Sequence, residues 1–201
     1  MAEHTAAGGV TPDTDRVLTV PNLLSAARLA GVPLFLWLIL RRDDGWALVV
    51  LALAGFTDYL DGKIARRFHL VSRVGQLLDP IADRLYIAAT LVGLAWRDII
   101  PWWLVALLLA RELLLAGVLL VLRQIGQVGL PVHFVGKAAT FNLLYAFPVL
   151  LLAEVSPTLA TWALPIGWAL AWWGVALYWL AAVLYVVQAA GLLRAHRAGA
   201  R

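Results

Sequence analysis

The sequence predicts an all-α fold, namely a polytopic membrane protein with six transmembrane helices and both termini in the cytoplasm. Three observations predict it. Of the 201 residues, 63% are hydrophobic and only 14% are charged, whereas soluble domains carry roughly 25% charged residues. The mean hydropathy is +0.85. The apolar residues also fall into six stretches, each near the length of about 20 residues that a membrane span needs.

The six predicted spans are separated by short polar or basic turns. They are Pro21–Leu40, Trp46–Ala65, Val74–Trp96, Ile99–Leu122, Val132–Ala153 and a sixth contained within Leu159–Leu193. Pro21 suits the first turn of a helix, and Pro165 is expected to mark the true start, or a kink, of the last span. We expect a flexible N-terminal tail over 1–15, one membrane domain over 16–194 and a basic C-terminal tail over 195–201.

Basic residues are unequally divided between the two sides of this six-span arrangement. One side would hold both termini and Arg16, Arg66, Arg67, Arg73, Arg123, Arg194, Arg197 and Arg201, and the other only Arg41, Arg42 and Arg97. Cytoplasmic loops are enriched in Lys and Arg, so we expect a multi-pass protein of the cell (plasma) membrane with cytoplasmic termini. The pI near 9.9 does not indicate a nucleic-acid partner, because the basic residues form only short loop clusters, which suit anionic lipid surfaces.

Four aspartates lie inside the predicted spans, where a bilayer penalises charge. Asp58 and Asp61 fall in the cytoplasmic half of the second span, and Asp79 and Asp83 fall in the cytoplasmic half of the third. The spacings i, i+3 and i, i+4 place each pair on one helix face. Two helices are therefore expected to bring four carboxylates to the same depth in the membrane.

This cluster predicts a site for hard divalent cations. Four carboxylates cannot all stay ionised in a low dielectric without cations, and oxygen ligands select Mg²⁺ or Mn²⁺ rather than Zn²⁺. The small residues Gly62, Ala65 and Gly75 lie on the same two faces and let a ligand or a neighbouring backbone come close. Two ions about 3.5–4 Å apart would clamp the attacking and leaving oxygens of a phosphoryl displacement.

Two other interpretations of the acids are open at this point. Paired carboxylates near helix ends can be solvated caps or partners of basic loops. Transporters also bury acids along proton or ion pathways. The number of acids and their fixed register with glycines and an Ala-Arg pair favour the metal site over both.

The register of these residues resembles the signature of the CDP-alcohol phosphotransferase family (class I CDP-alcohol phosphatidyltransferases). The sequence reads Asp58-Tyr-Leu-Asp61-Gly62-Lys-Ile-Ala65-Arg66, then eight residues, Gly75, three residues, Asp79, three residues and Asp83. It matches that signature without a departure. The signature is short but its fixed positions are specific, and the six predicted spans agree with the family fold, so the resemblance extends over most of the chain from about Arg16.

The resemblance implies roles for these residues. Asp58, Asp61, Asp79 and Asp83 would bind metal, and Asp83 would also be catalytic by accepting the proton of the acceptor hydroxyl. Gly62, Ala65, Arg66, Ser72 and Gly75 would line the site for the CDP-lipid. Arg66 can offer a planar donor fork to the diphosphate, although it could instead be a loop charge that sets topology. Ser72 could equally be a helix cap.

The start of the first span carries a polar stripe. Asn22, Ser25 and Arg28 follow each other at intervals of three residues, in a segment that looks like the opening of bacterial phosphatidylglycerophosphate and cardiolipin synthases of this family. The stripe is expected to face the CDP-lipid pocket. The alternative is ordinary capping at the membrane surface.

The acceptor is predicted from weaker signals. Arg111 and Lys137 could each bind an acceptor phosphate, although Glu112 could neutralise one of them. The segment Gly136-Lys137-Ala-Ala-Thr140 lacks the second Lys expected of members that use glycerol 3-phosphate, and a doubly charged acceptor favours more cationic groups. The chain looks most like actinobacterial members that use phosphatidylglycerol.

The resemblance therefore implies a complete reaction. A phosphatidyl group would pass from CDP-diacylglycerol to phosphatidylglycerol, giving cardiolipin and CMP, with glycerol 3-phosphate as the alternative acceptor and ion or proton transport as the remote alternative function. Mg²⁺ or Mn²⁺ would be the cofactor, with two ions expected. The family also implies a homodimer in the lipid bilayer, with the active site facing the cytoplasm.

Overall fold

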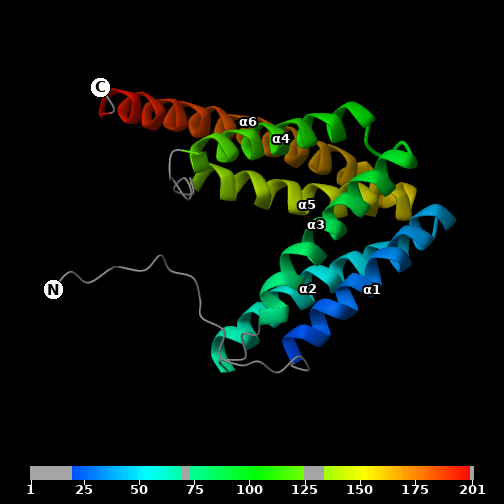
Figure 1. The fold of residues 1–201 in the computed structure, drawn as a ribbon. Helices are drawn as coiled ribbons and strands as arrows, with labels where there is room; N and C mark the ends of the chain where they lie inside the picture. The colour runs from blue at the N-terminus through cyan, green and yellow to red at the C-terminus, as the bar shows by residue number, and fades with distance from the viewer. Residues whose placement is uncertain (1–19, 69–72, 125–133, 200–201) are drawn as a thin grey trace. The chain divides into compact units, whose positions relative to one another are not determined.

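The computed structural model describes residues 20–68, 73–124 and 134–199 (Figure 1). Within the helices, the side chains of residues 20–22, 58–59, 61–62, 64–68, 73–81 and 195–199 lie outside the description. The described elements are the helices α1 (Val20–Arg41), α2 (Asp44–Phe68), α3 (Arg73–Trp96), α4 (Trp102–Gln124), α5 (Phe134–Val155) and α6 (Pro157–Gly199). The predicted all-α fold is thus confirmed for these residues. The predicted tail over 1–15 and most of the loop before α5 lie outside them.

Four of these helices contain segments long and apolar enough to cross a membrane. The segments are Leu23–Arg41, Trp102–Gln124, Phe134–Val155 and Pro157–Arg194. In α2 the described apolar stretch is shorter, Asp44–Thr57, and the side chains of the two residues that follow it, 58 and 59, lie outside the description. Many large apolar side chains on the helices are exposed, including those of Leu113, Phe134, Trp173 and Val187, and an apolar exterior of this kind suits contact with lipid.

The predicted polar turn after the first helix is a compact helix-terminating motif. The Arg42 amide donates to the Ile39 carbonyl (3.1 Å), and the Asp43 amide donates to the Leu38 carbonyl (3.0 Å). Arg42 adopts a left-handed conformation with φ of 63°. This is the hydrogen-bond pattern of a Schellman motif, which satisfies the last carbonyls of a helix. Asp98, just after α3, adopts a similar φ of 58°.

The chain divides into two compact units, Met1–Gly93 and Leu94–Arg201. In the first, α1 and α2 lie side by side (Figure 1). Tyr86 on α3 packs its ring against Phe35 on α1, with 5.8 Å between centroids, and donates a hydrogen bond to the Val50 carbonyl on α2 (3.2 Å). A Cβ on Gly93 would lie 3.3 Å from the Ile39 side chain. The described part of α3 therefore contacts both α1 and α2.

In the second unit, α5 packs closely on α6 and α4 also packs on α6 (Figure 1). Helices α5 and α6 run antiparallel, and their contacts recur every seven residues. Its pairs are Gly136 with Ala181, Leu143 with Gly174, and Leu150 with Gly167. A Cβ on Gly167 or Gly174 would lie 2.8 Å from a leucine side chain, so glycine at these positions allows the two backbones to approach.

The boundary between α5 and α6 differs from the sequence prediction. The expected turn over 154–158 is a single residue, Ser156, because α5 continues to Val155 and α6 begins at Pro157. Ser156 caps α6, since the Leu159 amide donates to its Oγ (3.3 Å), and Pro157 occupies a position where its missing N–H costs nothing. Of the two alternatives predicted for Pro165, the start of the helix is therefore wrong, because Pro165 lies inside α6, and a kink stays a prediction. The helix also continues to Gly199, into the predicted basic tail.

Candidate active site

The helices carry the four signature aspartates in the predicted register. Asp58 and Asp61 lie on α2, and Asp79 and Asp83 lie on α3. Of these four side chains, the structure describes that of Asp83. It describes no group of three or more potential metal-ligating side chains within its described residues, and the Asp58, Asp61 and Asp79 carboxylates lie outside them.

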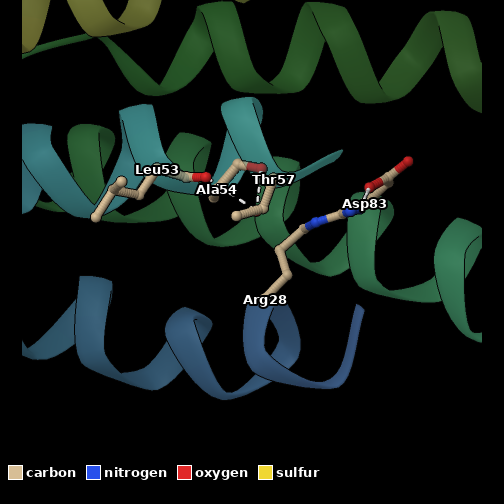
Figure 2. Close-up of polar contacts among 5 residues, drawn as sticks. All are labelled: Arg28, Leu53, Ala54, Thr57 and Asp83. Atoms are coloured by element: carbon tan, nitrogen blue, oxygen red, sulfur yellow. Dashed lines mark hydrogen bonds and ion pairs between the residues drawn. The ribbon is translucent and has the colours of Figure 1, made fainter. Parts of the chain in front are cut away.

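Asp83 is held by a cation from another helix. Nη1 of Arg28 on α1 donates to Oδ1 of Asp83 on α3 and forms an ion pair with it across 55 residues of sequence (Figure 2). The Arg28 side chain is only 2% exposed, whereas the Asp83 side chain is 44% exposed. The guanidinium is therefore enclosed, and the carboxylate that it contacts is open to its surroundings.

The neighbours of this pair are set by helical spacing. Ser25 lies one turn before Arg28 and is completely buried. Tyr86 lies three residues after Asp83 and anchors α3 to α2 through Val50. Thr57, the residue before Asp58, donates to the carbonyls of Leu53 and Ala54, both at 2.9 Å, so its hydroxyl bonds to its own helix (Figure 2).

The donor set of these helices fits a hard divalent cation. All four signature acids offer carboxylate oxygens, the ligands that Mg²⁺ and Mn²⁺ prefer. The Asp83 carboxylate, which the structure describes, is 44% exposed, and its Oδ1 is held by Arg28. The chain contains no cysteine, so a thiolate site of the kind that selects Zn²⁺ is excluded.

The residues expected to bind the CDP-lipid are distributed over the first unit. Asn22, Ser25 and Arg28 all lie on α1, which begins at Val20. Gly62, Ala65 and Arg66 lie on α2 and Gly75 lies on α3. Ser72 lies outside the described residues. The structure therefore describes two side chains of the predicted pocket, Ser25 and Arg28, and both are buried.

A second polar cluster lies in the other unit. Nη1 of Arg111 on α4 donates to Oε1 of Glu112 (2.7 Å), and the guanidinium carbon lies 3.9 Å from the centre of the Tyr178 ring on α6. The Tyr178 hydroxyl donates to the same Glu112 oxygen. Glu112 thus neutralises Arg111, as the alternative interpretation of the sequence allowed, while Lys137 is exposed on α5.

Sequence reasoning missed two of these partnerships. It identified Arg28 and Asp83 separately but not their contact, and it did not identify Tyr178. The partners are 55 and 66 residues apart, so helical periodicity gives no signal for either pairing. Their only sequence signal is that ionisable residues inside membrane spans pair with one another.

Comparison with known proteins decides the family. The family model of CDP-alcohol phosphatidyltransferases matches residues 18–187. The chain belongs to this family. The resemblance inferred from the signature is therefore confirmed, and the protein is a transferase enzyme. The matched range includes α2 and α3 with all four aspartates, the paired Arg28, and the Arg111–Tyr178 cluster.

Relatives of the transferase share most of its length. A Streptomyces coelicolor protein named cardiolipin synthase (CMP-forming) is 61% identical over 188 residues, which cover 90% of this chain and 87% of the relative. A Mycobacterium tuberculosis relative is 45% identical over 181 residues, with the same coverage of both chains. A Bacillus subtilis CDP-diacylglycerol–glycerol-3-phosphate 3-phosphatidyltransferase is 32% identical over 151 residues, covering 68% of this chain and 78% of the relative.

Proposed function

We propose that the transferase is a CMP-forming cardiolipin synthase, which moves a phosphatidyl group from CDP-diacylglycerol to phosphatidylglycerol. The observation that carries this proposal is the 61% identity, over 90% of the chain, to a Streptomyces coelicolor protein of that name. The glycerol 3-phosphate enzyme of Bacillus subtilis is a more distant relative at 32% identity. The missing second Lys after Lys137 supports the same choice of acceptor.

The chemistry is a direct displacement in which Asp83 is the base. The Asp83 carboxylate takes the proton of the terminal hydroxyl of phosphatidylglycerol. The hydroxyl oxygen then attacks the β-phosphorus of CDP-diacylglycerol, the bond from this phosphorus to the bridging oxygen breaks, and CMP leaves. A base must reach the proton that it removes, and the 44% exposure of the Asp83 side chain supports this role.

Asp58, Asp61, Asp79 and Asp83 would hold the divalent ions. Two Mg²⁺ or Mn²⁺ ions, when bound, supply charge neutralisation for the diphosphate and the leaving CMP. The CDP-lipid would lie against residues of α1, α2 and α3: Asn22, Ser25, Arg28, Gly62, Ala65, Arg66, Ser72 and Gly75. Arg111 and Lys137 are the residues proposed to bind the acceptor phosphate, and Arg111 would do so beside Glu112.

The membrane arrangement is part of the proposal. Six helices would cross the cell membrane, with both termini and the loop between α2 and α3 in the cytoplasm, so that the active site faces the cytoplasm. The excess of basic residues on that side supports this orientation. A homodimer is proposed from the family resemblance.

The test of the acceptor uses the purified full-length enzyme with CDP-diacylglycerol and Mn²⁺. We expect CMP release and cardiolipin formation with phosphatidylglycerol, and little CMP with glycerol 3-phosphate. The reverse preference would replace the proposal with phosphatidylglycerophosphate synthesis. Ion flux in vesicles without CMP release from either acceptor would instead favour a transporter.

A further inference from the structure

Arg28 is an unusual cation for a membrane helix because it is enclosed rather than directed to an aqueous surface. Its side chain is 2% exposed and lies in ion-pair contact with Oδ1 of Asp83. A buried charge is costly unless it is paired with good geometry. Arginine cannot lose its proton in proteins, so this positive charge remains beside Asp83 under all working conditions.

The contact distinguishes the two oxygens of Asp83. Oδ1 accepts the hydrogen bond from Arg28, and the other carboxylate oxygen is directed away from Arg28 (Figure 2). A divalent ion that used both oxygens of Asp83 would have to share Oδ1 with a permanent cation. Two like charges on one oxygen repel each other, so the pairing disfavours Asp83 as a two-oxygen metal ligand.

We propose that Arg28 is a positioning residue that acts as a resident counter-ion of Asp83. It holds Oδ1, weakens the grip of the divalent ion on this carboxylate, and keeps the second oxygen directed to the acceptor hydroxyl. This inference rests on the proposed function, in which Asp83 is the base.

The proposal predicts changes of opposite sign for Arg28→Gln. Loss of the competing charge should tighten Mn²⁺ binding to the substrate-free full-length protein about fivefold. Loss of the fixed carboxylate should lower kcat about tenfold to a hundredfold. Mn²⁺ affinity is measured by electron paramagnetic resonance of the free ion in detergent, and kcat by CMP release.

Two further variants isolate the charge. Arg28→Lys keeps the cation but not the planar donor fork, so Mn²⁺ affinity should stay at the wild-type value while kcat falls. This variant also gives a result if Arg28→Gln does not fold, as judged by circular dichroism and gel filtration. Arg84→Gln removes the same charge from the exposed residue next to Asp83 and should leave Mn²⁺ affinity unchanged.

Unchanged or weaker Mn²⁺ binding in Arg28→Gln would overturn the proposal. Weaker binding would mean that Arg28 supports Asp83 as a metal ligand, because hydrogen bonds to a ligand from neighbouring residues normally strengthen metal binding. Retention of the wild-type kcat in Arg28→Gln would also overturn it. For Arg28→Lys, weaker Mn²⁺ binding is the contradictory result. The proposed function is tested separately by the wild-type acceptor assay, and the Mn²⁺ comparison needs no substrate.

Discussion

At the scale of single residues, Asp83 combines accessibility with a fixed orientation. Its carboxylate is half exposed, yet one oxygen is bound by the enclosed Arg28 guanidinium from α1. A general base needs access to the proton and a defined direction toward it.

In the second unit, Glu112 holds Arg111 and Tyr178 together, so a candidate phosphate-binding cation already has an anionic partner.

Removing the proposed base should stop turnover. Asp83→Asn is nearly isosteric but cannot accept the proton, and general-base catalysis is worth about 10²–10⁴-fold in rate, so we expect kcat for CMP release to fall by at least about 10²-fold. Asp98→Asn is the matched control, because it removes an exposed carboxylate from a turn where φ is 58° and Asn tolerates that conformation. A near-normal rate for Asp83→Asn would remove Asp83 from the mechanism.

Activity should depend on hard divalent ions. Treatment with EDTA is expected to abolish CMP release, and Mg²⁺ or Mn²⁺ should restore it, because the acidic cluster offers only oxygen ligands. Zn²⁺ should restore it poorly. Full activity after exhaustive chelation, with the residual metal measured by mass spectrometry, would contradict the proposed metal site.

At the scale of elements, the α5–α6 pair shows how glycine positions set the distance between helices. Leu150 and Leu143 of α5 fill the space left by Gly167 and Gly174 of α6. Small residues at such contacts let membrane helices approach closely, and van der Waals packing then stabilises the pair. The seven-residue repeat of these contacts is typical of helices that pack at a small crossing angle.

Gly167→Ala should destabilise this helix pair. Its Cβ would lie 2.8 Å from the Leu150 side chain and 3.2 Å from the Leu150 backbone nitrogen, and overpacking of this kind costs about 1–3 kcal/mol. Gly191→Ala makes the same change in the same helix where nothing lies within 4 Å. Compared with the wild type, we expect a lower melting temperature for Gly167→Ala and an equal or higher one for Gly191→Ala. Unfolding is measured by tryptophan fluorescence in detergent. Equal melting temperatures would contradict the close packing.

At the scale of the whole molecule, the pattern of charges defines the proposed orientation in the membrane. In the proposed six-span arrangement, the turn after the first span and the end of the sixth would lie on opposite sides, because five spans would separate them. The apolar exposed faces of the helices suit lipid, and the basic residues on the side of the termini suit the cytoplasm.

Single cysteines can test this topology cleanly, because the chain contains none of its own. A membrane-impermeant maleimide should label Asp43→Cys in intact cells, since Asp43 is exposed in the turn before α2. Arg194→Cys, exposed near the end of α6, should be labelled only after the cells are permeabilised. The unmodified chain is the control for background labelling. Labelling of both positions in intact cells would overturn the orientation.

The helices, the family and the register of the aspartates could all be predicted from the order of the residues. Span length and hydropathy are properties of consecutive residues, and a bilayer requires helices or closed barrels, so helix locations followed to within a few residues. The start of α6 is the exception, because Pro165 is predicted to mark the start of the helix or a kink, whereas the Ser156 cap and Pro157 begin the helix earlier.

Which polar groups of distant helices meet depends on the tertiary structure. Arg28 reaches Asp83 and Tyr178 reaches Glu112 across 55 and 66 residues, and each pairing depends on how separate helices pack and face each other. Helical periodicity places a residue on a face but does not choose the helix that covers it. For this transferase, local sequence therefore specifies the chemical groups, and packing assigns their partners, because burial of a charge is tolerated only where an opposite charge lies within reach.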